Sequence, residues 1–241
     1  MSLKDKRIVI IGGSSGIGLA VAQGALREGA RVTVSSSRQE TVDKGLSKLK
    51  GAEGMVADVK DEAQLATLFS RVGTFDHLVY TAGDWGGPRR GALETIDIKE
   101  SEAVFAVRFW GALAAVKQAK KHLAANGSIT LTDGMIAHRP TKGSFVSTGM
   151  AGAVEHMTRG LAFELAPIRV NAVCPGAIRT EIWNTLVPEA QRESAIKQMG
   201  DRVPLKRIGE PEEVAEAYLY LMRGGYTTGQ VLYVDGGQSV V

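Results

Sequence analysis

The sequence of 241 residues has only one cysteine, Cys174, so no disulfide can form within the chain. No apolar run approaches the ~20 residues that cross a membrane, and the run that ends at Gly12 is shorter than the ~7–15 apolar residues of a signal peptide. Neither sign of charge forms a block, because 29 basic and 26 acidic residues are interspersed. These absences exclude a disulfide scaffold and predict a soluble, cytoplasmic protein that binds neither membrane nor nucleic acid.

The sequence does contain short apolar runs bounded by glycine, which alternate with longer segments of helical period. This alternation is typical of parallel β-α-β units with right-handed crossovers. It predicts strands at residues 7–12, 31–36, 54–59, 77–82, 128–133, 169–175 and 230–236. It predicts helices at residues 17–28, 39–50, 61–70, 101–125, 147–166 and 210–222. The expected fold class is α/β, with residues 1–241 forming a single domain around a doubly wound parallel sheet of about seven strands.

Residues 176–209 form one long stretch that we expect to be irregular. A loop of this length in a compact domain usually serves as a lid or a substrate cover. Its apolar side chains would suit a partly apolar small-molecule ligand, although they would also suit a packing helix; they are Trp183, Leu186, Ile196 and Met199.

A glycine-rich turn lies between the first predicted strand and the first predicted helix. Backbone without side chains allows a pyrophosphate to approach, and the helix N-terminus offers free N–H groups and the positive end of its dipole. The pattern therefore predicts a dinucleotide site, and a tight turn without a ligand is the alternative. The predicted binding residues are Gly12, Ser14, Ser15, Gly16, Ile17 and Gly18.

The end of the second predicted strand indicates which dinucleotide is bound. An acidic residue at this position holds the ribose hydroxyls of NAD(H), whereas a cation accommodates the 2′-phosphate of NADP(H). The sequence has Ser36, Ser37 and Arg38 here and no carboxylate. The predicted cofactor is therefore NADP(H), unless Arg38 is only a solvated surface residue.

Five segments, in this order, resemble motifs of the short-chain dehydrogenase/reductase family over nearly the whole chain. They are GGSSGIG at 12–18, ADV at 57–59, TAG at 81–83, IRVNAVCPGAIRT at 168–180 and TTGQVLYVDGG at 227–237. The resemblance implies a Rossmann-type fold in which Asp58 and Val59 border the adenine and Ala82 and Gly83 the neighbouring ribose. It also implies contacts to the nicotinamide from Pro175, Gly176, Ile178 and Thr180.

Family members usually work with an asparagine, a serine, a tyrosine and a lysine. The lysine holds the nicotinamide ribose and lowers the pKa of the tyrosine, which protonates the carbonyl oxygen as the hydride arrives. The resemblance places Arg108 at the asparagine position, Gly134 at the serine, Ser147 at the tyrosine and Ala151 at the lysine. We therefore expect an atypical member that lacks this tetrad.

A substitute proton donor is the first interpretation of this loss. Asp133 would lie at the carboxyl end of its strand, where ligands bind in open α/β sheets, and a dry pocket would raise its pKa until it can donate a proton. Ser147, Lys142 or His138 would instead donate or relay the proton, and Arg108 would stabilise a developing oxyanion. Arg108 also suits a polar position on a packed helix, and Ser147 also suits a helix N-cap.

Two other interpretations stay open. An iminium or a polarised alkene would need little help from an acid, and an active-site carboxylate would attract a cationic substrate. Alternatively, the chain would bind NADP(H) without turnover, as a sensor or as an inactive subunit of a hetero-oligomer. The nucleotide motifs are common to all three interpretations and do not separate them.

Several further residues are candidates of lower specificity. Trp85 would stack on a ring and Arg89 or Arg90 would meet an anion, whereas His156 fits a packing or interface position. The resemblance implies a homodimer or homotetramer in which the helices of Arg108 and Ser147 pair. Small residues would allow these helices to approach closely, namely Ala112, Ala115, Gly152 and Ala153. No set of metal ligands is predicted.

Overall fold

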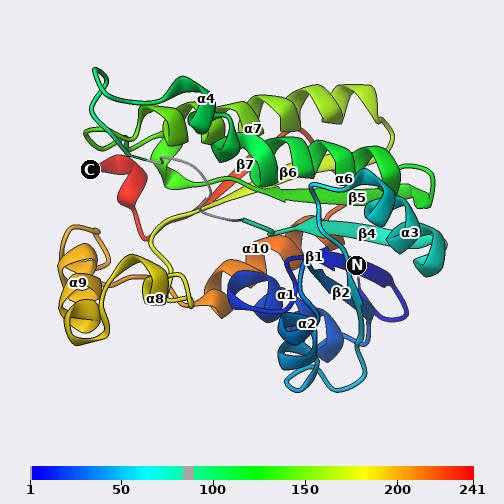
Figure 1. The fold of residues 1–241 in the computed structure, drawn as a ribbon. Coiled ribbons are helices and arrows are strands. Elements are labelled where there is room, and N and C mark those ends of the chain that lie inside the picture. The colour runs from blue at the N-terminus through cyan, green and yellow to red at the C-terminus, as the bar shows by residue number, and fades with distance from the viewer. Residues whose placement is uncertain (1, 84–89) are drawn as a thin grey trace.

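The computed structural model describes residues 2–83 and 90–241, which form one sheet with helices on both faces (Figure 1). Seven parallel strands lie in the order β3-β2-β1-β4-β5-β6-β7. The predicted doubly wound parallel sheet is confirmed. The strands are β1 (Arg7–Ile11), β2 (Arg31–Ser36), β3 (Glu53–Val56), β4 (Phe75–Tyr80), β5 (Leu123–Thr132), β6 (Arg169–Pro175) and β7 (Val231–Val234).

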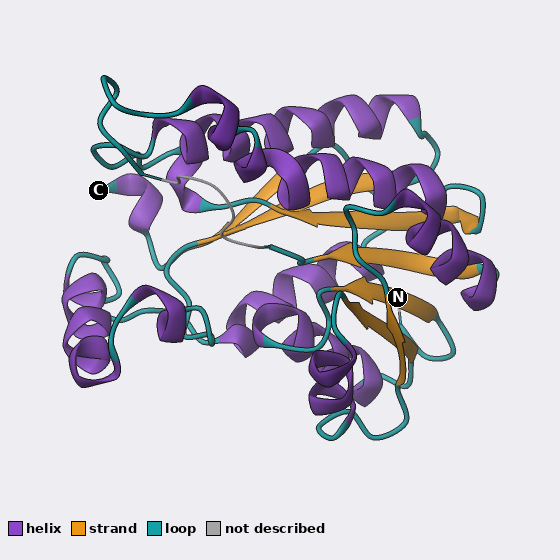
Figure 2. Cartoon of the chain, in the orientation of Figure 1, coloured by secondary structure: helices purple, strands orange, loops and turns teal. Residues whose placement is uncertain are grey.

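The helices form two layers around the sheet (Figure 2). Helices α1 (Gly16–Arg27), α2 (Gln39–Leu46) and α10 (Pro211–Arg223) cover one face, and α3 (Glu62–Val72), α6 (Ala112–Ala119) and α7 (Phe145–Glu164) cover the other. The shorter elements are α4 (Ile98–Ser101), α5 (Ala103–Phe105), the π-helix η1 (Ala106–Gly111), the 3-10 helix η2 (Met135–Ala137), α8 (Trp183–Leu186), α9 (Glu189–Asp201) and the 3-10 helix η3 (Gln238–Val240).

Strand β1 shows why its sequence is a continuous apolar run. Ile8 and Ile10 belong to the core against α1 and α10, whereas Val9 and Ile11 belong to the core against α3, α6 and α7. Side chains alternate between the faces of a strand, so a strand covered on both faces needs apolar residues at every position. The apolar run is therefore what an inner strand of this sheet requires, and β1 lies between β2 and β4.

The predicted helix at residues 101–125 is wrong in two respects. It is divided by η1, whose wider π-turns contain Arg108, and α6 ends at Ala119. The chain then enters β5 at Leu123, five residues earlier than predicted, because Leu123 pairs with Phe75 across a register shift. Ala112 and Ala115 are also buried in the core of this chain, so they do not line a surface for a partner helix.

The expectation that residues 176–209 are irregular is also wrong, because they contain α8 and α9. Trp183 donates its indole N–H to the carbonyl of Ile178 at 2.8 Å and packs with Ile196 in a small separate core, to which Met199 adds. These side chains hold the segment together, so only Leu186, which is 44% exposed, presents a large apolar side chain outward among the four predicted. The alternative prediction of a packing helix is therefore confirmed for Trp183, Ile196 and Met199.

The junction between β1 and α1 leaves no room for a side chain at Gly18, and this yields the first prediction. A Cβ at Gly18 would lie 2.2 Å from the carbonyl oxygen of Gly12 and 2.4 Å from Thr81 Oγ1. We expect Gly18→Ala to lower the free energy of unfolding by about 1–3 kcal/mol through overpacking. Gly160→Ala is the matched control, because nothing lies within 4 Å of a Cβ on this residue of α7.

Urea titration of both variants checks this expectation. The control variant should gain about 1 kcal/mol, because alanine is a better helix former than glycine. Equal changes in the two variants would show that the close approach of Gly18 to β1 does not limit stability.

Candidate functional site

The glycine-rich turn lies at the carboxyl end of β1 and packs on the end of β4. Gly12 has a φ of +85°, and a Cβ there would lie 2.5 Å from the backbone nitrogen of Ala82. Gly16 opens α1 with a φ of +49°, and its N–H donates to Glu181 Oε2 at 3.1 Å. Ser15 is the exposed N-cap residue and makes no side-chain cap bond. The N-terminus of α1 thus already donates a hydrogen bond to a carboxylate oxygen. The same free N–H groups and the positive end of the helix dipole would bind a phosphate oxygen.

Two serines near this turn have unsatisfied hydroxyl groups. Ser14 and Ser35 are buried, and neither Oγ has a hydrogen-bond partner in the described parts of the chain. An orphaned buried hydroxyl is costly unless a ligand or water completes it. Together with the turn that has no room for a Cβ, this observation fits a dinucleotide at the end of β1.

The predicted adenosine end of the site lies after β2 and β3. Ser37 and Arg38 are exposed, Ser36 is half-buried, and Arg38 occupies the N-cap position of α2. Within residues 2–83 and 90–241 no ion pair holds the Arg38 guanidinium. Its exposure is compatible with binding a 2′-phosphate, although a solvated cation would have the same geometry.

Asp58 and Val59, predicted near the adenine, have different surroundings. Asp58 is half-buried, its N–H donates to Gln64 Oε1 at 3.0 Å, and its Oδ1 accepts from the Lys60 N–H. Val59 is buried against η1, because a Cβ on Gly111 would lie 2.8 Å from its Cγ2. Asp58 is thus held by residues at the start of α3, and Val59 packs against η1; their predicted place near the adenine stays a prediction.

The predicted nicotinamide residues follow β6. Pro175 ends that strand, and Gly176 packs so closely on Asp235 that a Cβ would lie 2.8 Å from its Cα. Ile178 is buried, and the methyl group of Thr180 lies 3.2 Å from the position of a Cβ on Gly16. The structure thus brings the segment after β6 into contact with the turn after β1. Ala82 and Gly83, after β4, complete this sheet edge.

Arg108 points toward the same edge. A Cβ on Gly83 would lie 2.7 Å from Arg108 Nη2 and 2.9 Å from its Nε, so the guanidinium lies against the backbone of Gly83. The π-helix η1 carries Arg108, and single π-turns of this kind are frequent at functional sites. The guanidinium therefore lies beside the predicted ribose position rather than on the outer face of the helix.

Asp133 directly follows β5 and is buried, with 2% of its surface exposed. Its N–H donates to the carbonyl of Val173, but neither carboxyl oxygen has a donor among the residues that the structure describes. Burial, and then the neighbouring Glu155 carboxyl, raise the pKa of Asp133 to about 8. The raised pKa favours the neutral acid, which is the state required of a proton donor.

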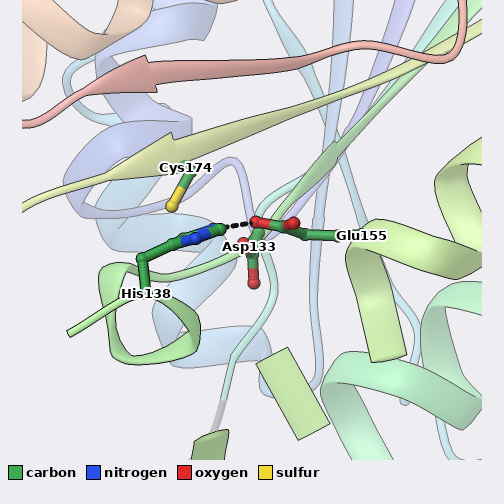
Figure 3. A group of neighbouring side chains, drawn as sticks. All are labelled: Asp133, His138, Glu155 and Cys174. Atoms are coloured by element: carbon green, nitrogen blue, oxygen red, sulfur yellow. Dashed lines mark hydrogen bonds and ion pairs between the residues drawn. The ribbon is translucent and has the colours of Figure 1, made fainter. Parts of the chain in front are cut away.

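Four side chains meet around Asp133, and we call them the buried cluster: Asp133, His138, Glu155 and Cys174 (Figure 3). Glu155 reaches in from α7, and its carboxyl group makes a hydrogen bond with His138 Nε2. Although burial raises its pKa, contacts with Asp133 and His138 hold the pKa of Glu155 below its ordinary value. Burial, followed by the charge of Asp133, raises the pKa of the Cys174 thiol far above its usual range. The cluster thus keeps Glu155 ionised while Asp133 stays neutral.

Sequence reasoning missed Glu155, Cys174 and the adjoining Tyr233, although one signal was present. Ser147, Ala151 and Glu155 are spaced by four residues, so they lie on one face of α7. An acidic residue one turn beyond the predicted lysine position therefore had to face the same site. Cys174 and Tyr233 lie on β6 and β7, and no local pattern connects them to Glu155.

Ser147 is buried in the first turns of α7 and is not its N-cap. Ser144 is the N-cap residue, and its hydroxyl accepts from the Thr141 N–H and donates to the Thr141 carbonyl. The alternative role of Ser147 as a cap is therefore wrong. Its position on the face that also carries Glu155 leaves its predicted catalytic role open.

The remaining candidates are placed less favourably. Lys142 and Arg90 are exposed, and Trp85 and Arg89 lie outside the described residues. His156 is exposed on α7 and bonds through Nδ1 to the carbonyl of Gly152 at 3.0 Å. This corrects the expectation of packing within the chain, while an interface position stays a prediction. No helix of residues 2–83 or 90–241 is both long and apolar enough to cross a membrane.

Comparison with known proteins shows to which family the chain belongs. A family model described as enoyl-(acyl carrier protein) reductase matches residues 12–239. The short-chain dehydrogenase/reductase ATR9 of Stachybotrys chlorohalonatus is 37% identical over 252 residues, which cover 98% of this chain and 98% of that protein. The chain belongs to the short-chain dehydrogenase/reductase family. The resemblance seen in its five motifs is thereby confirmed.

Solved structures agree with this short-chain dehydrogenase/reductase over its full length. The MalC reductase/Diels-Alderase from Malbranchea aurantiaca is 32% identical, with a TM-score of 0.90 and coverage of 99% of this chain and 97% of that one. A small-chain dehydrogenase in complex with NADPH is 31% identical, with a TM-score of 0.82 and coverage of 99% and 100%. Both comparisons extend the likeness from sequence motifs to the whole sheet and its helices.

Proposed function

We propose that this short-chain dehydrogenase/reductase is an NADP(H)-dependent oxidoreductase that reduces a carbonyl, an imine or an activated alkene, with Asp133 as the proton donor. The observation that carries the proposal is a carboxyl group buried at the carboxyl end of a central strand, where burial and the Glu155 carboxyl raise its pKa. Ligands bind at this edge of open α/β sheets. The resemblance assigns the family's usual tyrosine and lysine positions to Ser147 and Ala151, and on that assignment we propose Asp133 as the group that supplies the proton.

In the proposed reaction, the cofactor and three residues of the site have separate roles. NADPH, when bound, supplies a hydride to the unsaturated carbon of the substrate. Asp133 gives its proton to the oxygen, nitrogen or carbon that gains the electron pair. Arg108 lies beside Gly83 and would stabilise negative charge that develops on that atom. Ser147, on the inward face of α7, would orient the substrate or pass the proton on.

The cofactor part of the proposal rests on Arg38 and is supported by the NADPH complex of a structural neighbour. We expect Arg38→Ala to weaken NADPH binding by about 10–100-fold, because a hydrogen bond to a charged group contributes ~1.5–3 kcal/mol. Affinity for NADH should stay unchanged, since NADH has no 2′-phosphate. Fluorescence titration with both dinucleotides measures this, and Arg90→Ala is a control on an exposed arginine outside the predicted adenosine end.

A wild-type Kd for NADH equal to or below that for NADPH would contradict the choice of cofactor. The same conclusion would follow if Arg38→Ala changed both affinities equally.

We also propose a homodimer or homotetramer, in which the outer surfaces of η1 and α7 meet a second copy. Trp110 on η1 is 59% exposed and Phe163 on α7 is 91% exposed. Large exposed aromatic side chains are enriched where proteins associate.

The single, buried cysteine supports the cytoplasm as the expected compartment. We keep residues 176–209 as a proposed cover for the substrate, on the strength of their place after β6.

The activity is tested by mixing the protein with NADPH and a panel of ketones, cyclic imines, iminium ions and enones. Loss of NADPH absorbance and the reduced product, detected by mass spectrometry, would establish turnover. Preference for iminium ions would identify a substrate that needs hydride alone. Tight NADPH binding without any product would favour the sensor or inactive-subunit alternative.

A further inference from the structure

A buried acid that donates a proton in each turnover must be reprotonated. Asp133 is 2% exposed, and the described chain places no hydrogen-bond donor on its carboxyl oxygens. Few neighbours could therefore exchange a proton with Asp133. The inference drawn from them rests on the proposed role of Asp133 as the proton donor. The titratable and charged groups around the cluster are Glu155 and Arg159 from α7, His138 after η2, Cys174 from β6, Tyr233 from β7, Asp235 after β7, Tyr218 from α10 and Arg108 from η1.

One continuous path leads from Asp133 to solvent. Asp133 faces Glu155, which is 4% exposed, and Glu155 contacts Nε2 of His138 (Figure 3). The His138 side chain is 30% exposed, so its ring connects the buried carboxyl pair with water. Cys174 offers no second path, because it is fully buried and its thiol keeps its proton.

His138 Nε2 has two partners, a carboxylate that only accepts a hydrogen bond and a hydroxyl that can also donate one. It contacts the Glu155 carboxylate, and the Tyr233 hydroxyl lies 2.9 Å from the same nitrogen. A protonated Nε2 donates to Glu155, whereas an unprotonated Nε2 accepts from Tyr233. The rings of His138 and Tyr233 also pack edge to face, with their centroids 4.9 Å apart. This contact holds the imidazole in place while Nε2 gains or loses a proton. The arrangement therefore stabilises His138 both before and after it loses a proton.

We propose that Glu155 and His138 relay a proton from solvent to Asp133 after each turnover. When Asp133 has given its proton to the product, the proton on His138 Nε2 passes to Glu155 and a proton of Glu155 passes to Asp133. Water at the exposed edge of His138 then restores its proton. One proton leaves solvent and one reaches the product for each hydride transferred, so charge and atoms balance. Glu155 and His138 are positioning residues that act through Asp133.

A bound metal ion is the competing interpretation of the cluster. Its four donor atoms lie within 4.8 Å of one another, and their chemical types would suit a transition metal. Two features favour the proton instead: Nε2 is already engaged by Glu155 and Tyr233, and two adjacent buried carboxyl groups are compatible when they share one proton. Elemental analysis of the purified protein is therefore part of the test.

The kinetic test compares Glu155→Gln and His138→Gln with His156→Gln, a control on an exposed histidine of α7. The first two variants should lower kcat by about tenfold or more, a smaller effect than loss of the donor itself, while KM and the Kd for NADPH stay unchanged. His156→Gln should leave kcat unchanged. Added imidazole should restore turnover in His138→Ala in proportion to its concentration. Wild-type kcat in His138→Gln would overturn the relay.

A second measurement does not depend on turnover. Infrared spectra in D2O across pH 6–10 should show the carbonyl band of a protonated carboxyl group, absent in Asp133→Asn. In Glu155→Gln the midpoint of its titration should fall, because a neighbouring negative charge is removed. The relay is overturned if Glu155→Gln leaves the midpoint unchanged, or if one metal ion per chain is found and its removal by chelation creates the band. If the wild-type protein reduces no substrate but the carboxyl band titrates as expected and its midpoint falls in Glu155→Gln, the result would count against the proposed activity and not against the relay.

Discussion

Replacing Asp133 with asparagine should lower kcat for reduction by about 10²–10⁴-fold, the usual contribution of a positioned general acid. Asparagine has nearly the same shape and fits the same buried site after β5, but it has no acidic proton to give. The Kd for NADPH should stay within a factor of about two of the wild-type value, since Asp133 has no predicted contact with the dinucleotide. Steady-state rates with a panel substrate, together with NADPH titration, measure both quantities.

Asp133→Asn should also make the free energy of unfolding less dependent on pH. The carboxyl of Asp133 has an ordinary pKa of 3.8 in the unfolded chain, and burial followed by Glu155 raises it to about 8 in the folded protein. Between these values the folded state holds a proton that the unfolded state has lost, so stability falls as pH rises from about 4 to about 8. Asp133→Asn removes this dependence, and urea titration at pH 5 and pH 9 should show a smaller loss of stability in the variant.

Unchanged turnover in Asp133→Asn would remove Asp133 from the mechanism. In that case Ser147 would be the next donor to test, because it lies on the same face of α7 as Glu155. A loss of turnover accompanied by a loss of stability at pH 9 would instead indicate that the substitution damages the fold.

The pH dependence of reduction should have its break at the titration of Asp133. The donor must be protonated, so kcat should be constant below about pH 8 and then fall by about tenfold per pH unit above it. For oxidation in the reverse direction the acceptor must be ionised, and the rate should instead rise toward pH 8. Initial rates between pH 6 and pH 10, with NADPH and substrate saturating, give both profiles.

A control separates this break from effects on binding. The Kd for NADPH, measured at the same pH values, should not show a break near pH 8. Glu155→Gln should move the break to lower pH, because Glu155 is the second cause that raises the pKa of Asp133. A flat profile for kcat from pH 6 to pH 10 would contradict proton donation by Asp133 and would favour a substrate that needs hydride alone.

The fold was largely predictable because its signals are local. The continuous apolar run of β1, the glycine turn before α1 and the apolar runs of the other strands all depend on residues close in sequence. The errors occur where pairing between distant residues overrides the local pattern. Leu123 joins β5 through Phe75, and residues 176–209 become helical because Trp183 and Ile196 can bury each other.

The candidate site divides in the same way. The sequence by itself determined the turn from Gly12 to Gly18, and it determined that Asp133 follows a strand whose carboxyl end lies at the ligand edge. It could not show that Arg108 reaches Gly83, since that depends on the turn geometry of η1. The direction of a long side chain is set by the helix around it and not by its own identity.

Only the tertiary structure decided the proton state of Asp133. Burial at the end of β5, and then the Glu155 carboxyl from α7, raise the pKa of Asp133, while contacts with Asp133 and His138 lower the pKa of Glu155. These residues are separated by 22 positions at most, yet they come from a strand end, a short turn and the middle of a helix. Charge states depend on burial and on distances between groups, and both exist only once these elements have packed together.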